Sequence, residues 1–262
     1  MAIIIILVIL FITVVVSIFL ISNYSTFKNA LYHFKKCNVV VAGKKGSGKD
    51  LFFQKIINKR KEVYYANIPY GGDYKRNKLT DYNIIDKNGK ILTYDNFLRD
   101  DIFKTKHKFL ENADHYISEG GILLPSHMDS VLHKRYPSLP VYYALSRHLY
   151  NSNIHVNLQN FERLWKPLRE QSDFYVYVHK TIKLPFVLIT LYSTYDNYNS
   201  AVQRLKPVKA RILNKYSKAE MDIYKATNGD IRSGWIIQLK RNVKYNTRYF
   251  ETLLLKGKRK VK

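Results

Sequence analysis

The residues best suited to chemistry lie in one short segment, which reads GKKGSGKD from Gly43 to Asp50. It contains the pattern G-x-x-x-x-G-K, in which glycines let backbone N–H groups surround a phosphate and the lysine reaches the β and γ oxygens of a nucleotide. A β-branched run, CNVVVA, precedes it, and an amphipathic stretch, DLFFQKIINKR, follows it. This order predicts an ATP site formed by Gly43, Lys44, Lys45, Gly46, Ser47, Gly48, Lys49 and Asp50. The alternative is a chance glycine turn in which Asp50 only caps the helix.

Two residues depart from the usual pattern and predict an unusual metal site. After the lysine the pattern has Ser or Thr, whose hydroxyl binds Mg²⁺, but this chain has Asp50. A carboxylate on a second strand normally supports the metal, but in ENADHYISEGGILLPS that position is Ser118. The two oxygen types are exchanged rather than lost, so we expect Asp50 and Ser118 to bind Mg²⁺ together. The alternative is that Asp50 caps its helix and Ser118 only fills space.

Glu119 directly follows the same short strand, His115–Ser118. A carboxylate at the end of a strand beside a phosphate site can act as a general base or orient the attacking water. We therefore predict that Glu119 is catalytic together with Lys49. The alternative is a surface carboxylate in a turn.

These residues must be positioned by an alternating series of strands and helices. The pattern predicts strands at Cys37–Ala42, Glu62–Ala66, His115–Ser118, Ile154–Leu158, Phe174–Val178 and Phe186–Tyr192. It predicts helices at Asp50–Arg60, Asp101–Glu111 and Val141–Asn151. Strands separated by helices of this length imply βαβ units, so the expected fold class is α/β with a mainly parallel sheet.

The amino terminus predicts a membrane anchor. Ala2–Ile21 reads AIIIILVILFITVVVSIFLI, and about 20 helical residues span about 30 Å, the thickness of the hydrocarbon layer. A cleaved signal peptide is the alternative, but there is no basic segment before the run and no clear cleavage site. Basic residues begin after the span, so the remainder is expected in the cytoplasm. The expected organisation is an anchor at 1–22, a basic juxtamembrane linker at 23–36, a core at 37–206 and a basic extension at 207–262 that contains a possible hairpin.

The composition excludes several classes of protein. The 262 residues carry 44 Lys and Arg against 20 Asp and Glu, a formal charge of +24, which predicts an anionic partner. Cys37 is the only cysteine, so an internal disulfide and a cysteine-built zinc site are excluded, and no histidine pair has metal spacing. Tyr and basic residues are interleaved between 192 and 216, a pattern that fits single-stranded DNA and anionic lipid equally well.

The order of several motifs resembles the Zonula occludens toxin-like ATPases, a family that includes the gene I morphogenesis proteins of filamentous phages, the inoviruses. The resemblance covers about 38–178 and rests on GKKGSGKD, the triplet NIP at 67–69, ISEGGILLPS, the helix with Ser146, Arg147 and His148, and a strand that ends in Gln159 before Arg163 and Arg169. It implies a P-loop ATPase core with an additional strand, akin to the FtsK and HerA group.

The resemblance also implies residue roles, partners and location. Gln159 would be a polar sensor and therefore part of the catalytic set, and Arg147, Arg163 and Arg169 stand where the family has basic residues that act in trans. Each arginine is, as an alternative, an ordinary surface charge. The implied function is assembly and extrusion of phage with single-stranded DNA, by a homo-oligomeric ring in the host inner or plasma membrane that contacts coat and assembly proteins.

Two departures from the family pattern keep other functions open. The anchor precedes the ATPase core instead of following it, and no large extracytoplasmic domain follows it in this sequence. One alternative is a DNA-packaging or conjugative translocase of the same fold. Another is a basic membrane protein that hydrolyses nothing and binds nucleic acid or anionic lipid.

Overall fold

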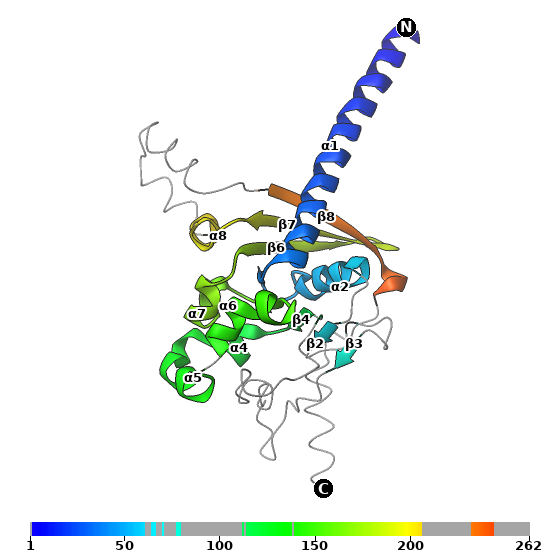
Figure 1. Cartoon of the computed structure of the whole chain (residues 1–262). Helices are drawn as coiled ribbons and strands as arrows, with labels where there is room; N and C mark the ends of the chain where they lie inside the picture. Colours follow the sequence, from blue (N-terminus) through cyan, green and yellow to red (C-terminus); the bar gives the residue numbers. More distant parts are fainter. Residues whose placement is uncertain are drawn as a thin grey trace, which may run out of the picture.

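The computed structural model describes residues 2–60, 64–66, 70, 77–79, 112, 114–137, 139–205 and 232–243 (Figure 1). Its centre is an eight-stranded sheet in the order β3-β2-β4-β5-β1-β6-β7-β8. The strands are β1 Val39–Ala42, β2 Tyr64–Ala66, β3 Asn77–Leu79, β4 Asp114–Ile117, β5 Ile154–Leu158, β6 Phe174–Lys183, β7 Val187–Tyr195 and β8 Arg232–Leu239. The α-helices are α1 Ala2–Lys36, α2 Lys49–Arg60, α4 Gly120–Leu123, α5 Asp129–Arg135, α6 Leu139–Tyr150, α7 Lys166–Glu170 and α8 Tyr198–Leu205. Three short 3₁₀ helices, η2 Ser126–Met128, η3 Phe161–Arg163 and η4 Lys240–Asn242, complete the described elements.

The sheet is parallel from β3 to β6 and antiparallel from β6 to β8. The expected α/β fold with a mainly parallel sheet is therefore confirmed. In β1 all four residues, VVVA, are buried, because β1 lies between β5 and β6 with helices over both faces. β5 is buried along its whole length too, so the polar residues His155 and Asn157 lie inside the molecule.

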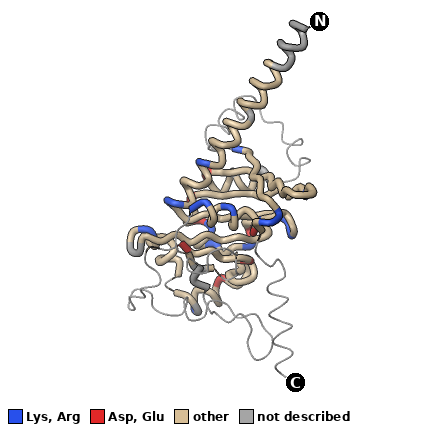
Figure 2. Tube along the Cα trace, turned by 90° about the vertical axis from the view of Figure 1, so that its right-hand side faces the viewer, with Lys and Arg blue, Asp and Glu red and all other residues tan. Residues whose placement is uncertain are grey.

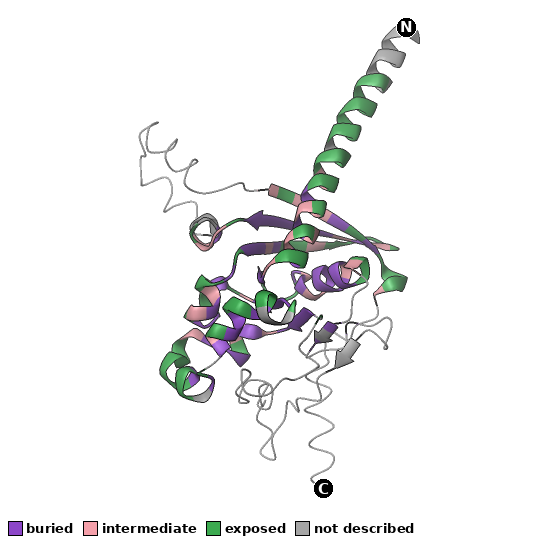
Figure 3. Cartoon of the chain, viewed as in Figure 1, coloured by how far each residue is buried: buried purple, intermediate pink, exposed green. Residues whose placement is uncertain are grey.

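Two hydrophobic clusters cover the two faces of the sheet. On one face, α2 and the carboxyl-terminal half of α1 pack against β1, β6 and β7 through Phe34, Phe52, Phe53 and Tyr192 among others. On the other face, the cluster around Trp165 joins α4–α8 to β1 and β5. Figure 3 shows the buried residues concentrated in these layers, with the described upper part of α1 exposed.

α1 is one continuous helix of 35 residues, so the segment 23–36, which we expected to be a linker, is helical. Within the described part of the chain α1 holds the one stretch that could cross a membrane by length and composition, Leu10–Lys36, which is almost entirely exposed over its most apolar part. One face of its last turns is buried, with Ala30 and Phe34 fully inside the core. The aromatic ring of Phe34 lies 4.6 Å from that of His155 between centroids.

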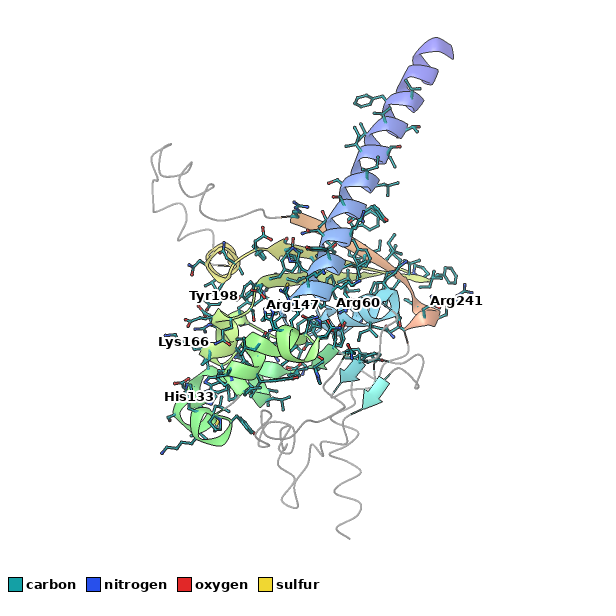
Figure 4. The ribbon with its side chains drawn as sticks, in the orientation of Figure 1. Arg60, His133, Arg147, Lys166, Tyr198 and Arg241 are labelled. Atoms are coloured by element: carbon teal, nitrogen blue, oxygen red, sulfur yellow. The ribbon has the colours of Figure 1, made fainter. Side chains whose placement is uncertain are left out.

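Three side chains of the globular part bind the last carbonyl groups of α1. Arg60 donates to the carbonyl oxygen of Phe34, Asn153 to that of Lys35 at 3.3 Å, and Arg147 to that of Lys36 at 2.7 Å. The final carbonyl groups of a helix have no partner within the helix, and cations there also oppose the negative end of its dipole. In Figure 4, Arg60 and Arg147 lie beside the lower end of α1. α1 is therefore fixed to the sheet at the edge where the parallel strands begin.

A buried ionic cluster supports that attachment. Arg60 forms an ion pair with Asp114, and both side chains are at least nine-tenths buried. Asn153 donates to Asp114 Oδ1 through its backbone N–H at 3.2 Å and its side-chain amide at 3.1 Å. Burial alone raises the pKa of Asp114, but His155, Arg60 and Asn153 together lower it below its ordinary value.

Part of the expected carboxyl-terminal extension belongs to this sheet, since β8 pairs with β7 over its full length. The first arm of the predicted hairpin is thus β8, and its described partner is β7. The second arm, the basic tail, the predicted helix at 101–111 and the NIP triplet lie outside the described residues.

Candidate nucleotide-binding site

The loop between β1 and α2 has the geometry of a phosphate cradle. Gly46 and Gly48 have φ values of +77° and +103°, which L-residues with side chains rarely adopt. A Cβ at Gly48 would also collide with the hydroxyl of Thr181 on β6. That hydroxyl donates to the Ser47 carbonyl at 2.8 Å, so β6 holds the loop in place. The loop therefore requires glycine at Gly48 for both backbone and packing reasons.

Lys49 is folded back into this loop at the start of α2. Its side-chain nitrogen donates to the carbonyl oxygens of Gly43 and Lys44 at 3.0 and 3.3 Å, and the residue is only 5% exposed. Burial lowers the pKa of Lys49, while Glu119 and Asp50 oppose that effect. A buried cation held only by carbonyl oxygens is well placed to exchange them for phosphate oxygens.

Asp50 and Ser118 are in direct contact, as the metal hypothesis requires. The Ser118 hydroxyl donates to Asp50 Oδ1 at 3.0 Å. The same oxygen accepts from Asn157 Nδ2 at 2.7 Å and from the Tyr70 hydroxyl at 3.1 Å. Among the described residues, these three donors leave Asp50 Oδ2 free for a cation. Asp50 therefore does more than cap its helix, because it joins α2 to β4 and β5.

Sequence reasoning missed Asn157 and Tyr70. Asn157 is completely buried, and its Oδ1 accepts from the backbone N–H of Glu119 at 3.0 Å and from Ser118 at 3.3 Å. One amide thus positions Asp50, Ser118 and Glu119. The available signal was an amide that alternates with apolar residues in the strand Ile154–Leu158, two residues before Gln159. No sequence pattern marked Tyr70.

Glu119 lies at the carboxyl-terminal end of β4, where the backbone adopts a left-handed conformation with φ 56°. A non-glycine residue in that region carries a conformational cost, and such strain clusters at functional sites. Burial raises the pKa of Glu119 above its ordinary value, although Lys49 lowers it, Asp50 raises it further, and Gln159 and Lys45 lower it. Glu119, Gln159 and Lys49 are therefore near neighbours, in the arrangement expected for a carboxylate base beside a phosphate cradle.

The three arginines have separate environments. Arg147 binds α1 at the opposite edge of the sheet from the loop. Arg169 donates to the Glu162 carbonyl at 3.1 Å and lies 4.7 Å from the ring of Tyr198. Arg163 is exposed and packs beside Gly121, directly after α4 begins. Arg163 is therefore the arginine of the three that is both exposed and close to Glu119 at the candidate nucleotide site.

The residues present fit a nucleotide with its metal. The Ser47 hydroxyl is buried and has no hydrogen-bond partner within the described residues, so it can bind a ligand oxygen. Asp50 and Ser118 supply one anionic and one neutral oxygen of the kind Mg²⁺ prefers. No cluster of three or more His, Cys, Asp or Glu that could hold a metal exists among the described residues. A metal here would therefore depend on the nucleotide for its remaining ligands.

No family model matches the chain, and no curated protein matches it. Several solved structures have a similar fold. The N-terminal domain of zonular occludens toxin from Neisseria meningitidis is 10% identical, with a TM-score of 0.44 over 82% of this chain and 96% of that one. The genome packaging NTPase B204 from Sulfolobus turreted icosahedral virus 2, solved with AMP, is 17% identical, with a TM-score of 0.37 over 80% and 95%.

The ATPase DotB from Legionella pneumophila is 10% identical, with a TM-score of 0.36 over 75% of this chain and 59% of that one. A zonular occludens toxin domain, the type expected from the motifs, is thus among the structures found, but TM-scores this low carry no argument. Nucleotide chemistry is supported instead by the loop, Lys49 and Glu119. The link to the phage gene I proteins stays a prediction.

Proposed function

We propose that this protein is a membrane-anchored P-loop ATPase that drives assembly and extrusion of filamentous phage with its single-stranded DNA. One observation carries the ATPase part of the proposal. At the carboxyl-terminal edge of β1, β4 and β5, the Asp50–Ser118 pair and Glu119 converge around the single amide of Asn157, directly beside the phosphate loop that Lys49 binds. Each of these groups suits one part of phosphoryl transfer.

In this proposal the loop and Lys49 bind the phosphates. The backbone N–H groups around Gly46 and Gly48 and the amino-terminal end of α2 provide positive potential. The Lys49 ammonium leaves the carbonyl oxygens of Gly43 and Lys44 and neutralises the oxygens of the transferred phosphoryl group. Asp50 and Ser118 would hold Mg²⁺, which supplies charge neutralisation on the phosphates when bound.

Glu119 is the proposed general base. A carboxylate whose pKa is raised accepts a proton from water more readily than an ordinary one. The Asn157 amide holds the backbone of Glu119, and Gln159 lies against its carboxylate, so both fix where that proton is received. The exposed Arg163 would complete the site of a neighbouring copy in a ring, a role for which the resemblance provides the support.

The membrane and cargo parts of the proposal rest on other features. The exposed apolar half of α1 supports insertion into the host inner or plasma membrane, with the sheet on the cytoplasmic side. The charge of +24 fits single-stranded DNA, and the motif resemblance supports contacts with phage coat and assembly proteins.

The test is ATP turnover by the full chain in phospholipid nanodiscs, with Mg²⁺ and with or without single-stranded DNA. Lys49→Ala should lower turnover by about 10²–10³-fold, because one fixed charge on the transition state is lost. Lys59→Ala, an exposed lysine on the same helix, is the matched control and should turn over ATP like the wild type. Wild-type turnover in Lys49→Ala would remove the ATPase proposal, and stimulation by DNA without coat-protein binding would favour a translocase.

A second test concerns orientation. A reporter fused to the amino terminus should report the outside of the cell, and one fused to the carboxyl terminus should report the cytoplasm. A carboxyl terminus outside the cell would deny the site access to ATP.

A further inference from the structure

One face of the antiparallel part of the sheet is apolar and partly exposed. Its cross-strand rows are Ile182–Ile189–Ile237, Val187–Leu239 and Leu191–Trp235. Because alternate side chains of a strand share a face, these residues lie on one side of the sheet. At the turn between β6 and β7, Leu184 is 44% exposed and Phe186 is 81% exposed. We call these nine residues the apolar sheet face.

The exposure is confined to that face. On the opposite side of the same strands Thr190 and Ile236 are buried, and Gln238 is 7% exposed. That side supports the phosphate loop, where Thr190 bonds to Thr181 at 3.0 Å. An exposed apolar surface of this extent on a folded sheet marks an interaction site.

The two described segments that form the apolar sheet face and its ends carry basic side chains and no acidic ones. The segments 179–195 and 232–243 contain no Asp or Glu, but they contain Lys180, Lys183, Arg232, Lys240 and Arg241. The backbone N–H of Lys240 donates to the Phe186 carbonyl at 3.0 Å, so η4 lies directly against the tip. Figure 4 shows Arg241 at the outer end of this part of the sheet. The chemistry of the face therefore fits a surface that is apolar and anionic.

The apolar sheet face begins where the apolar run of α1 ends. Ser22 and Asn23 follow that run, and Asn23 Oδ1 accepts from the backbone N–H of Trp235 at 2.7 Å. The same two residues line a cavity of about 300 Å³ together with Leu191 and Trp235. Leu239 is four residues beyond Trp235, at most about 13 Å along the strand. Figure 2 shows no Lys or Arg along the described upper part of α1, and the first cations appear where the sheet begins.

We propose that the apolar sheet face lies on the anionic lipid surface of the membrane that α1 crosses. Phe186 and Leu184 enter the boundary between headgroups and acyl chains, while the lysines and Arg241 pair with lipid phosphates. Seven of the nine side chains are aliphatic, which suits acyl chains, whereas binding of single-stranded DNA relies on aromatic stacking. The inference rests on the membrane part of the proposed function.

The experiment uses the full chain with Cys37→Ala, which removes the one native thiol. Phe186→Cys, Val15→Cys and Val131→Cys each receive an environment-sensitive dye in vesicles of phosphatidylcholine with phosphatidylglycerol. Val15 lies in α1, and Val131 is an exposed residue of α5 remote from α1. Lipids with a doxyl quencher should quench the dye at 186 and at 15 several-fold more than at 131. Iodide in the water should show the reverse order.

The outcomes separate the two proposals. Quenching by lipid at 15 without quenching at 186 would overturn the placement of the apolar sheet face and leave the anchor intact. The absence of lipid quenching at 15 would overturn the anchor and this inference with it. Protection of the dye at 186 from iodide by single-stranded DNA, without lipid quenching, would assign the face to nucleic acid. An independent variant removes the cations by changing Lys180, Lys183, Lys240 and Arg241 to Gln. In this variant, quenching of the dye at 186 should no longer depend on phosphatidylglycerol. Unchanged dependence would contradict the proposed lipid contact.

Discussion

The strands β4 and β5 carry polar residues at both ends, and the two ends are built differently. At the beginning of β4, Asp114 is held by Arg60 and Asn153, and its pKa is lowered. Just after the end of the same strand, Glu119 is half-buried with Gln159 bonded to its carboxylate, and its pKa is raised. A carboxylate that is fully paired stabilises the fold, whereas one that is desolvated and only partly paired is available to take a proton. The edge at which the parallel strands begin therefore holds α1, and the edge at which they end holds the proposed catalytic residues.

The largest expected effect is on Glu119. Glu119→Gln keeps the shape but removes the base, so ATP turnover should fall by about 10²–10⁴-fold while binding of nucleotide persists. The measurements are steady-state turnover and binding of a fluorescent ATP analogue. Glu162→Gln, an exposed carboxylate in η3, is the control. Loss of nucleotide binding together with turnover would show that Glu119 holds the site together instead of acting on water.

The same carboxylate predicts the pH dependence of turnover. Since the base must be ionised, turnover should fall as the pH drops through the pKa of Glu119, at a midpoint above its ordinary value of 4.5. On the alkaline side, turnover should fall as Lys49 loses its proton, at a midpoint below 10.5. A pH profile of kcat/KM checks both limbs. An acid midpoint at or below the ordinary Glu value would contradict the assignment.

The next largest expected effect is on the free energy of unfolding, at the edge of the sheet where Asp114 lies. Asp114→Asn leaves Arg60 buried without its partner, which should lower the free energy of unfolding by about 3–5 kcal/mol. Thermal unfolding of the full chain in detergent measures it. Glu170→Gln is the control, because its pair with Lys166 is more than half exposed at both side chains and contributes at most about 0.5 kcal/mol.

The sign of the pH effect follows from the lowered pKa of Asp114. The contribution of Asp114 to the free energy of unfolding is complete above the pKa that this residue has in the unfolded state. It is lost as the pH falls through the lower pKa of the folded state. The difference between wild type and Asp114→Asn should therefore be constant from neutral pH downward and shrink only below about pH 4. A difference that shrinks near pH 6 would indicate that a histidine, not Asp114, controls it.

A smaller, more diagnostic effect is the coupling between Asp50 and Ser118. Asp50→Ser should weaken Mg²⁺-dependent turnover, and Ser118→Asp should place two carboxylates beside the phosphates. The double exchange should recover turnover beyond the product of the single losses, by a coupling of about 0.5–3 kcal/mol. Titration of turnover with Mg²⁺ provides the measurement. Simple multiplication of the two losses would leave Asp50 as a structural residue that only binds Ser118, Asn157 and Tyr70.

The smallest effect is expected at Arg147. Arg147→Gln removes one bond and one cation from the end of α1, so it should cost about 0.5–1 kcal/mol of stability and leave turnover unchanged. Arg163→Gln, by contrast, should lower turnover if neighbouring copies complete each site. Comparing the two variants by thermal unfolding and turnover tests this division. A large loss of turnover in Arg147→Gln would instead support a role of Arg147 in the site of a neighbouring copy.

The conformation of the loop between β1 and α2 could be predicted from the sequence because local rules determine it. The positions of Gly46 and Gly48 follow from backbone conformation, and β1 and α2 follow from short apolar patterns. The ligands that a metal site requires predicted that Ser118 and Asp50 lie together. In the structure, the Ser118 hydroxyl lies 3.0 Å from Asp50 Oδ1. Their role toward Mg²⁺ stays a prediction.

What the sequence did not reveal depends on contacts between distant segments. Asn157 is 107 residues from Asp50, and its role exists only once β5 lies beside β1. The segment 23–36 contains polar and basic residues typical of a linker. The buried side of this helix, which includes Phe34, is formed only by contacts with distant segments. Arg147 binds Lys36 across 111 residues, which no local pattern indicates.

α2 has a mechanical consequence because of what its two ends contact. Lys49 at its first residue belongs to the phosphate loop, and Arg60 at its last residue binds the Phe34 carbonyl of α1. Twelve helical residues form a stiff rod of about 18 Å. If phosphate entering or leaving the loop displaces this rod, the displacement reaches α1 without crossing a flexible connection. The molecule thus contains a stiff connection from the proposed nucleotide site to the helix that is proposed to cross the bilayer.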